Sequence, residues 1–158
     1  DFKRIGKNVK ISKQASIYDY EKIEIGDNSR IDDFCVISGK ISIGINVHIT
    51  PMCLVAGGEK GIIFEDFTTI AYGVQVFTQS DDYSGNTMTN STVPPRIKCV
   101  IKISVRLKKH TLVGASSVVM PGVTLAEGTS VGARSLVLKS REPWVLYVRV
   151  TAERSKDR

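Results

Sequence analysis

Two adjacent acids, Asp81 and Asp82, stand in a long polar stretch of the chain that runs from Phe77 to Pro95. A carboxylate that is buried beside a second carboxylate has a raised pKa and can act as a general base. Acids that stand with Ser and Gly are also the usual composition of a solvated turn. The stretch interrupts a regular apolar pattern, and long irregular loops in compact domains are often functional. We therefore take the acid pair as a candidate for proton transfer.

Histidine, the other common proton acceptor, occurs twice, as His48 and His110, and not in this stretch. Two histidines are too few for the type of catalytic zinc site that is built from three imidazole ligands. Cys35, Cys53 and Cys99 are an odd number without metal-ligand spacing, which favours reduced thiols and a cytoplasmic setting. The residue types therefore indicate proton-transfer chemistry without a metal.

The bulk composition places these residues in one ordinary globular domain. The chain has 158 residues, of which 42% are hydrophobic and 24% are charged. Its apolar runs are short, so we expect no segment that spans a membrane. The net charge of +6 suits an anionic ligand or simple solubility, and no basic run interleaved with aromatic residues points to nucleic acid. The chain begins at Asp1 without a methionine, which leaves an exported or fused form open.

The elements that must position these side chains are set by a six-residue period. An aliphatic residue or phenylalanine recurs at every sixth position, with two extra residues before Ile25, three before Phe64 and a long excursion before Leu107. A helical period of 3.6 residues does not match this spacing. The anchors of the period are Ile5, Ile11, Ile17, Ile25, Ile31, Ile37, Ile43, Ile49, Val55, Phe64, Ile70, Val76, Leu107, Val113, Val119, Leu125, Val131 and Val137.

Each hexad is interpreted as a short strand followed by a turn. Three residues after the anchor there is often Asn or Gly, which tolerate a left-handed backbone conformation. A unit this short cannot bury its own anchor and must stack on copies of itself, as in a parallel β-helix. With three hexads per coil, the eighteen anchors predict six coils. In this frame Cys35 and Cys53 occupy a column of small packing residues, and His110 occupies a turn position.

The segments "IGDNSRID", "VGASSVVMPGVTL" and "VGARSLVLKS" resemble the hexapeptide-repeat acyltransferases, in particular the galactoside and maltose acetyltransferase-like branch. The loop sequences "SDDYSG" and "MTNSTVPP" are similar to those of sugar O- and N-acetyltransferases of bacterial surface-polysaccharide pathways, such as lipopolysaccharide O-antigen or capsule synthesis. The resemblance implies an all-β fold, a left-handed parallel β-helix over residues 1–138 with loop 77–104 projecting. It implies that residues 139–158 form a short C-terminal tail or helix that packs on the last coil.

The resemblance also implies a homotrimer that uses acetyl-CoA, with each active site between two subunits. Ala115 and Ala133 are 18 residues apart and are expected to stack one coil above the other. Each follows a glycine, Gly114 in the first case, so the corner would offer a smooth groove to the pantetheine arm of CoA; simple coil packing is the alternative. In the family these positions contact that arm, and Lys139 matches a lysine near the CoA nucleotide.

The C-terminal tail departs from the family pattern. The family carries a Gly-x-Pro-Ala motif there, whereas this chain has Arg149, Val150, Thr151 and Ala152. Arg154 is a further candidate for the CoA phosphates, with a solvated cationic tail as the alternative. CoA binding by the tail is therefore expected to be altered.

Many family members place a histidine as general base where Asp81 stands, and this leaves three interpretations. Asp81 or Asp82 is the base; or the acceptor is a sugar amine, which the acids only orient; or His48, from another coil or from the neighbouring chain, is the base. We rank the acids above His48. Ser80, Tyr83 and Ser84 of the same loop are candidate substrate-binding residues.

The leading hypothesis is an acetyl-CoA-dependent transferase that acts on a hydroxyl or amine of a sugar or nucleotide-linked sugar. The alternative is a catalytically silent trimeric β-helix that serves as a binding or scaffold protein. Zinc-dependent carbonic anhydrases share the fold, but two histidines are too few for their metal site.

Overall fold

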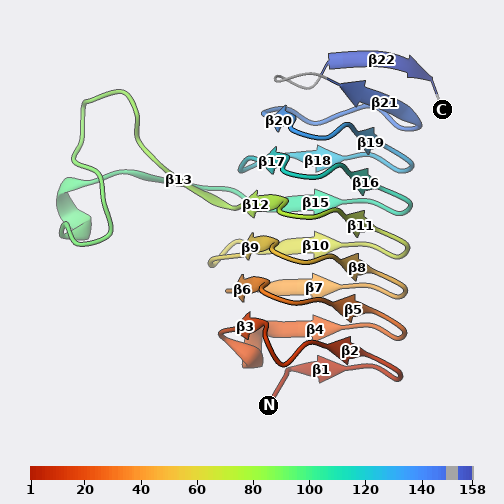
Figure 1. Ribbon diagram of the computed structural model, residues 1–158. Coiled ribbons are helices and arrows are strands. Elements are labelled where there is room, and N and C mark those ends of the chain that lie inside the picture. The colour runs from red at the N-terminus through yellow and green to blue at the C-terminus, as the bar shows by residue number, and fades with distance from the viewer. Residues whose placement is uncertain (149–152, 158) are drawn as a thin grey trace.

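The computed structural model describes the backbone of residues 1–148 and 153–157 and the side chains of residues 1–148. The chain winds into stacked triangular coils whose short parallel strands line up as three sheets (Figure 1). Sheet A contains β1 (Arg4–Ile5), β4 (Ile23–Ile25), β7 (Ile41–Ile43), β10 (Ile62–Phe64), β15 (Val105–Leu107) and β18 (Thr124–Leu125). Sheet C contains β3 (Ser16–Ile17), β6 (Val36–Ser38), β9 (Leu54–Ala56), β12 (Gln75–Phe77), β17 (Val118–Val119) and β20 (Leu136–Val137).

Sheet B is longer than the other two sheets. It contains β2 (Lys10–Ile11), β5 (Arg30–Ile31), β8 (His48–Ile49), β11 (Thr69–Ile70), β16 (Leu112–Val113), β19 (Ser130–Val131), β21 (Val145–Val148) and β22 (Glu153–Asp157). β21 is parallel to β19, whereas β22 is antiparallel to β21. The six predicted coils are therefore all present, and β21 adds part of a seventh within the segment predicted as the tail. That segment contains strands where a helix was an option, and residues 149–152 lie outside the described residues.

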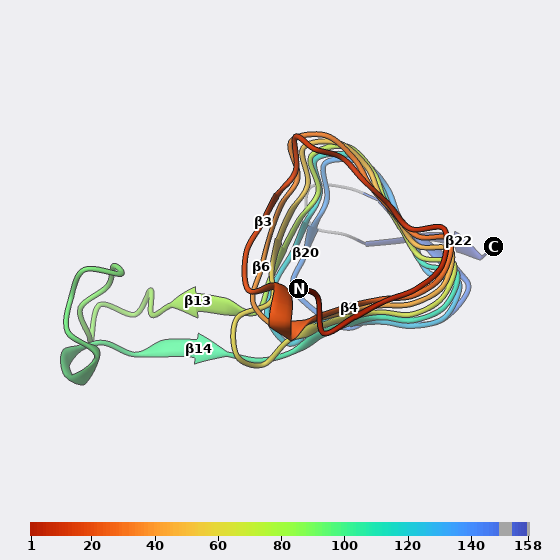
Figure 2. The same cartoon turned by 90° about the horizontal axis from the view of Figure 1, so that it is seen from below.

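The coils wind in the left-handed sense. In Figure 2, which is seen from the N-terminal end, the chain passes counter-clockwise from β3 to β4 and then to sheet B while it recedes from the viewer. We call the outward sides of the three sheets faces A, B and C, and the edges between them the A–B, B–C and C–A corners. The fold predicted from the six-residue period and the resemblance is confirmed.

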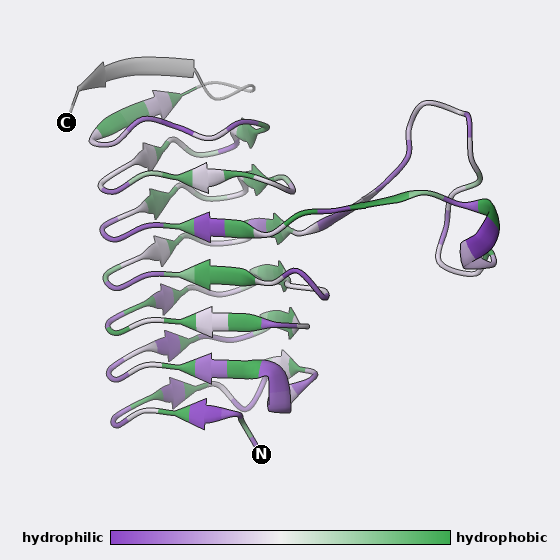
Figure 3. Ribbon diagram, turned by 180° about the vertical axis from the view of Figure 1, so that it is seen from behind, coloured by the Kyte–Doolittle hydropathy of each residue, from purple (hydrophilic) through white to green (hydrophobic). Residues whose placement is uncertain are grey.

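The anchors form the core of the prism. Nearly all of them are at most 2% exposed, and Phe64 fills the centre of its coil at 1%. Burying one such aliphatic side chain stabilises the fold by about 2 kcal/mol. The anchors of the first coil are the exceptions: Ile5 is 51% exposed, Ile11 is half-buried and Ile17 is 8% exposed, because this coil has a described neighbour on one side only. Figure 3 shows hydrophobic residues in the strands of successive coils, next to hydrophilic ones.

The corners are built from residues with positive φ. Asn28 (φ 58°), Asn46 (φ 54°) and Gly128 (φ 68°) occupy turn positions as the sequence predicts. Phe34 (φ 60°) and Met52 (φ 64°) adopt the same conformation, which their residue types did not indicate. The stacked hydrogen bonds of the coils therefore impose this geometry even on bulky side chains.

Every interruption of the six-residue period falls at the C–A corner. The first holds the 3-10 helix η1 (Tyr20–Lys22) between β3 and β4, and the second holds residues 57–61 between β9 and β10. The third is the long excursion between β12 and β15. One edge of the prism is therefore elaborated, while the other two keep a uniform repeat (Figure 2).

The excursion forms an arm that projects away from the prism (Figures 1 and 2). Its stalk is an antiparallel pair, β13 (Gln79–Asp81) with β14 (Val100–Lys102), and its tip carries the 3-10 helix η2 (Pro95–Ile97). The hydrogen bonds described for residues 82–99 join partners within the arm. Among the described residues no helix is long and apolar enough to cross a membrane.

Candidate functional site

Ala115 and Ala133 are in vertical register at the B–C corner, as the sequence predicts. β16 pairs with β19 so that Val113 lies next to Val131, and the amide of Arg134 donates a hydrogen bond of 2.8 Å to the carbonyl oxygen of Ala115. A Cβ added at Gly114 would lie 2.5 Å from the backbone nitrogen of Ala133. Gly114 is therefore required by coil packing, and the two alanines leave a shallow edge above it.

Lys139 lies at a different corner from these alanines. It follows β20 of sheet C, and Arg141 then bridges to Leu125 of sheet A, so Lys139 stands exposed at the C–A corner. In one chain the full width of face C separates it from Ala115 and Ala133. Arg154 belongs to β22, and its side chain lies outside the described residues.

Asp82 is committed to the internal structure of the arm. Its carboxylate accepts hydrogen bonds from the Ser84 amide (2.9 Å), the Ser84 hydroxyl (2.7 Å) and the Thr87 hydroxyl (3.1 Å). The hydrogen bonds from Ser84 hold the pKa of Asp82 below its ordinary value, and burial opposes them only weakly. The acid pair was expected to raise the pKa of one of its two members, and Asp82 is not that member; Ser84 serves the loop turn here.

Asp81 is less constrained than Asp82. It ends β13 opposite Val100, is half-buried, and accepts one long hydrogen bond of 3.3 Å from the Asn90 amide. The hydroxyl of Ser80 donates to the Asp81 carbonyl oxygen at 3.2 Å, so its contact is local. Tyr83 is 90% exposed beyond the stalk. Of the arm's two acids, Asp81 is the one whose carboxylate is free to meet a ligand.

His48 stands on face B in a cluster with Asp32 and Arg30. The His48 ring nitrogen Nε2 lies 2.7 Å from Asp32 Oδ2, and Arg30 Nε donates to Asp32 Oδ1 at 2.5 Å. Burial alone would raise the pKa of Asp32, but the hydrogen bonds from His48 and Arg30 outweigh burial and lower it. Asp32 therefore holds both partners in fixed orientations.

The partners of His48 were missed at the sequence level, although a signal was present. Arg30 and His48 are 18 residues apart and lie side by side in sheet B, as any pair at that separation does in a regular coil. Asp32 flanks the same anchor, Ile31, on the outward side. The 18-residue spacing of one coil places Arg30 beside His48, and Asp32 lies two residues after Arg30 on the same outward side, so the cluster could have been predicted.

His48 and Asp81 cannot meet within one chain. Face B is the side of the triangle that does not touch the C–A corner, from which the arm leaves (Figure 2). A site that contains both residues would need two chains.

His110, Cys35 and Cys53 pack against other residues of the fold. The His110 ring stacks on Phe67 with centroids 5.1 Å apart and lies 6.1 Å from the Trp144 ring. The Cys35 thiol lies 3.1 Å from the Thr50 carbonyl oxygen, and Cys53 is equally buried. A hydrogen bond with Cys35, together with burial, raises the pKa of the Cys53 thiol, so this residue is an unsuitable nucleophile.

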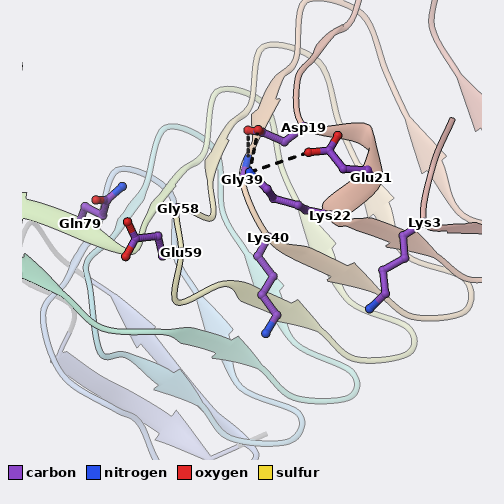
Figure 4. Close-up of a pocket in the computed structure, with 9 residues that line it drawn as sticks. All are labelled: Lys3, Asp19, Glu21, Lys22, Gly39, Lys40, Gly58, Glu59 and Gln79. Carbon is purple, nitrogen blue, oxygen red and sulfur yellow. Dashed lines mark hydrogen bonds and ion pairs between the residues drawn. The ribbon is translucent and has the colours of Figure 1, made fainter.

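A hollow of about 560 Å³ lies at the C–A corner on the coils below the arm (Figure 4). Asp19 lines it and accepts hydrogen bonds from the Gly39 amide (2.9 Å) and from Lys22 Nζ (3.1 Å). Gln79, the first residue of the stalk, closes one end of the hollow. The described residues contain no group of three His, Cys, Asp or Glu that could hold a metal ion.

Comparison with known proteins gives a consistent result. No protein-family model matches the chain. The dTDP-4-amino-4,6-dideoxy-D-glucose acyltransferase of Escherichia coli is 39% identical over 162 residues, which cover 98% of this chain and 84% of the relative.

Solved structures agree with this relative. The N-acyltransferase AntD from Bacillus cereus, crystallised with dTDP and 3-hydroxybutyryl-CoA, is 44% identical with a TM-score of 0.96, over 99% of this chain and 84% of AntD. A variant of AntD, crystallised with dTDP-4-amino-4,6-dideoxyglucose and coenzyme A, gives the same identity, coverage and TM-score. A hexapeptide-repeat acetyltransferase from Vibrio cholerae, 19% identical over 99% of this chain and 74% of its own, has a TM-score of 0.61 and shares the fold.

Proposed function

Because the chain belongs to the hexapeptide-repeat acyltransferases, we propose that it moves an acetyl group from acetyl-CoA to the 4-amino group of a dTDP-linked 4-amino-4,6-dideoxy sugar. The observation that carries the proposal is the extent of the match. The similarity covers 98% of the sequence and 99% of the fold, so it includes the arm as well as the prism. A β-helix with another function could share the prism without sharing the arm, so similarity over the arm supports a shared function.

An amine acceptor accounts for the absence of histidine from the arm. A sugar hydroxyl needs a strong general base, whereas a neutral amine is itself a good nucleophile. In the step, the amine nitrogen attacks the thioester carbonyl, the C–N bond forms and the C–S bond breaks. The CoA thiolate leaves and takes up the proton that the nitrogen loses, so the products are an amide and free CoA thiol.

In this scheme Asp81 orients the acceptor amine. Its carboxylate receives one long hydrogen bond from within the arm, so it has acceptor capacity left for an ammonium or amine N–H. His48, held by Asp32 through Nε2, keeps Nδ1 free to accept a proton and is the second candidate. Ala115 and Ala133 would line the pantetheine groove above, with Gly114 keeping the coils close.

The functional unit in this proposal is a homotrimer in which face C points to the threefold axis. The outward column of face C is largely apolar, whereas those of faces A and B are mostly polar or charged. The face C column is Ser16, Val36, Leu54, Gln75, Val118 and Leu136, of which four are apolar; that of face A is Arg4, Glu24, Ser42, Ile63, Arg106 and Thr124; that of face B is Lys10, Arg30, His48, Thr69, Leu112 and Ser130. An apolar face of this kind is typical of a permanent interface.

The positions of the arm and the alanine edge support the same assembly. They lie at opposite ends of face C, so a threefold arrangement brings the arm of one subunit to the B–C corner of the next. Each groove would then have Ala115, Ala133 and His48 on one wall, and Asp81 of the partner subunit and Lys139 of the partner subunit on the other. Apolar arm residues such as Met88 and Ile101, 55% and 48% exposed, would be covered by the neighbour.

The cellular setting belongs to the same proposal. Cys35, Cys53 and Cys99 are free thiols, which suits the reducing cytoplasm. The product, an N-acetylated dTDP sugar, is a building block for glycosyl transfer, and lipopolysaccharide or capsule synthesis would use it.

The experiment that tests the function follows free thiol release from acetyl-CoA. We expect release with dTDP-4-amino-4,6-dideoxyglucose and none with the same nucleotide sugar that carries a hydroxyl in place of the 4-amine. If only the hydroxyl compound is turned over, the protein is an O-acetyltransferase and the proposed amine acceptor is wrong. Binding of CoA without turnover of either compound would leave the silent scaffold as the function.

A further inference from the structure

The hollow beneath the arm has no role in the reaction described above. We infer that it holds the diphosphate of the nucleotide-linked acceptor; this inference rests on the proposed function and adds the place where the acceptor binds. The first observation is where the hollow lies. It is lined by all three interruptions of the repeat: Asp19, Glu21 and Lys22 of the first, Gly58 and Glu59 of the second, and Gln79 of the arm.

The corner that forms the hollow depends on glycine. Gly39 (φ 81°) and Gly58 (φ 51°) lie in consecutive coils, and a Cβ added at Gly39 would lie 2.3 Å from the Gly58 nitrogen. A Cβ added at Gly58 would lie 2.6 Å from the Gln79 side-chain nitrogen Nε2. A side chain at Gly39 would meet the backbone of the next coil and force the two coils apart. At Gly58 a side chain would displace the end of the Gln79 side chain and would be strained by the positive φ. The two glycines therefore allow the coils to approach closely beneath the first residue of the stalk.

Cations remain free in the hollow after its acids are accounted for. Asp19 is bonded to Lys22 and to the Gly39 amide, and Glu21 lies 3.9 Å from the same Lys22 ammonium. Glu59 lies 3.1 Å from Lys102. No carboxylate of a described residue lies within ion-pair distance of Lys40, whose side chain extends between Glu59 and Lys3 (Figure 4).

A second hollow, of about 270 Å³ on face A, continues from the first. It shares Lys3, Lys22 and Lys40 with the first hollow and adds Lys60, which also has no described carboxylate within ion-pair distance. Glu24 also lines this second hollow; it is paired with Lys3 at 2.5 Å and interacts with Lys40 only through a weaker charge interaction. Lys40 and Lys60 thus offer two ammonium groups without a bonded carboxylate in a connected depression. A diphosphate carries two adjacent anionic groups and is the ligand that such a pair attracts.

The level of the hollow along the prism fits an acceptor. The hollow lies on the coils before the arm, whereas Ala115, Ala133 and Lys139 lie on the coils after it. With donor CoA above the arm and the acceptor nucleotide below it, the thioester and the sugar amine would meet at the level of Asp81. The arm thus divides one groove into two ligand sections.

CoA also carries phosphates, so the experiment must separate the two sources of the same chemistry. The variant is Lys40→Gln with Lys60→Gln, and the control is Lys108→Gln, an exposed lysine near the A–B corner. Binding of dTDP and of CoA is measured separately by calorimetry, and KM is measured separately for the nucleotide sugar and for acetyl-CoA. Thermal unfolding of each variant checks that the fold is intact.

We expect dTDP binding to weaken about tenfold or more in the double variant, with CoA binding unchanged and Lys108→Gln without effect. KM for the nucleotide sugar should rise while KM for acetyl-CoA stays constant. Weaker CoA binding with unchanged dTDP binding would overturn the inference and assign the hollow to the donor. Unchanged binding of both ligands would also overturn it, even in an active transferase. Charge-dependent dTDP binding by a protein that transfers no acetyl group would refute the proposed function and leave the inference standing.

Discussion

Arg134 donates a backbone hydrogen bond of 2.8 Å to the carbonyl oxygen of Ala115, one coil below. This contact sets Ala133 directly over Ala115, so small side chains follow the glycine of the B–C corner at two successive levels, while the turn itself carries Ser116 below and the exposed Arg134 above. We assign the pantetheine arm of CoA to the edge that results.

The variant Ala115→Leu should weaken CoA binding about tenfold or more, because the added side chain would occupy the groove. Binding of dTDP should be unchanged. Glu127→Leu, at the equivalent turn position of the A–B corner, is the matched control. Calorimetric titration with CoA and with dTDP measures both effects. Equal CoA affinity in the Leu variant and the wild type would mean that the alanines are packing residues alone.

Asp81→Asn should lower kcat/KM for the nucleotide sugar by at least about tenfold, because the amide cannot bind an ammonium as a carboxylate does. KM for acetyl-CoA should be unaffected. Asp82→Asn is the informative comparison, since Asp82 accepts three hydrogen bonds within the arm. It should destabilise the arm, seen as faster proteolysis of residues 82–99, with a smaller effect on the rate constant of a folded sample. A rate unaffected by Asp81→Asn would remove this residue from the site.

Asp32→Asn should destabilise the protein in a pH-dependent way. The pKa of Asp32 is lowered in the fold, so its contribution to stability is present above the ordinary Asp value of 3.8 and is lost as the pH falls through the lower folded value. The difference in unfolding free energy between wild type and variant should be constant near pH 6 and vanish towards pH 2. Urea unfolding at several pH values measures it, with the exposed Glu127→Gln as control. A difference that persists at pH 2 would argue against the ionised Asp32 as the stabilising form.

Val36→Glu should convert the proposed trimer into monomers, because it places a charge on the apolar face C. Ile63→Glu on face A is a closely matched control, since both side chains are 38% exposed in the single chain. Sedimentation or light scattering measures the mass, and activity should fall with the loss of the trimer, because each groove needs two subunits. Trimers that survive Val36→Glu and dissociate with Ile63→Glu would place the interface on face A.

The period of six allowed most of the prism to be predicted. It gave the strands, the inward anchors and the stacking of residues 18 apart, because these follow from a repeat that cannot bury its side chains alone. It did not reveal that Phe34 and Met52 adopt left-handed turns, since the hydrogen bonds of neighbouring coils decide this and residue type does not.

The candidate site was harder to predict than the fold. The short insertions at residues 18–22 and 57–61 looked like mere gaps in the repeat, yet with the arm they form one elaborated corner. The sequence could not tell which acid of the pair would have a raised pKa, and Asp82 has a lowered one because loop hydroxyls and an amide stabilise its charged form. The sequence does not specify which acidic side chain of a solvated loop forms hydrogen bonds within that loop, because this depends on the local backbone geometry.

Strand β22 affects whether molecules of this protein can polymerise end to end. A stack of parallel coils ends in an open edge, onto which a second molecule could add further coils and so build a fibre. β22 runs antiparallel to β21. At sheet B, a coil of a second molecule would therefore meet a strand whose direction is opposite to that of the other strands. Addition of a further parallel coil onto β22 is thereby disfavoured at sheet B.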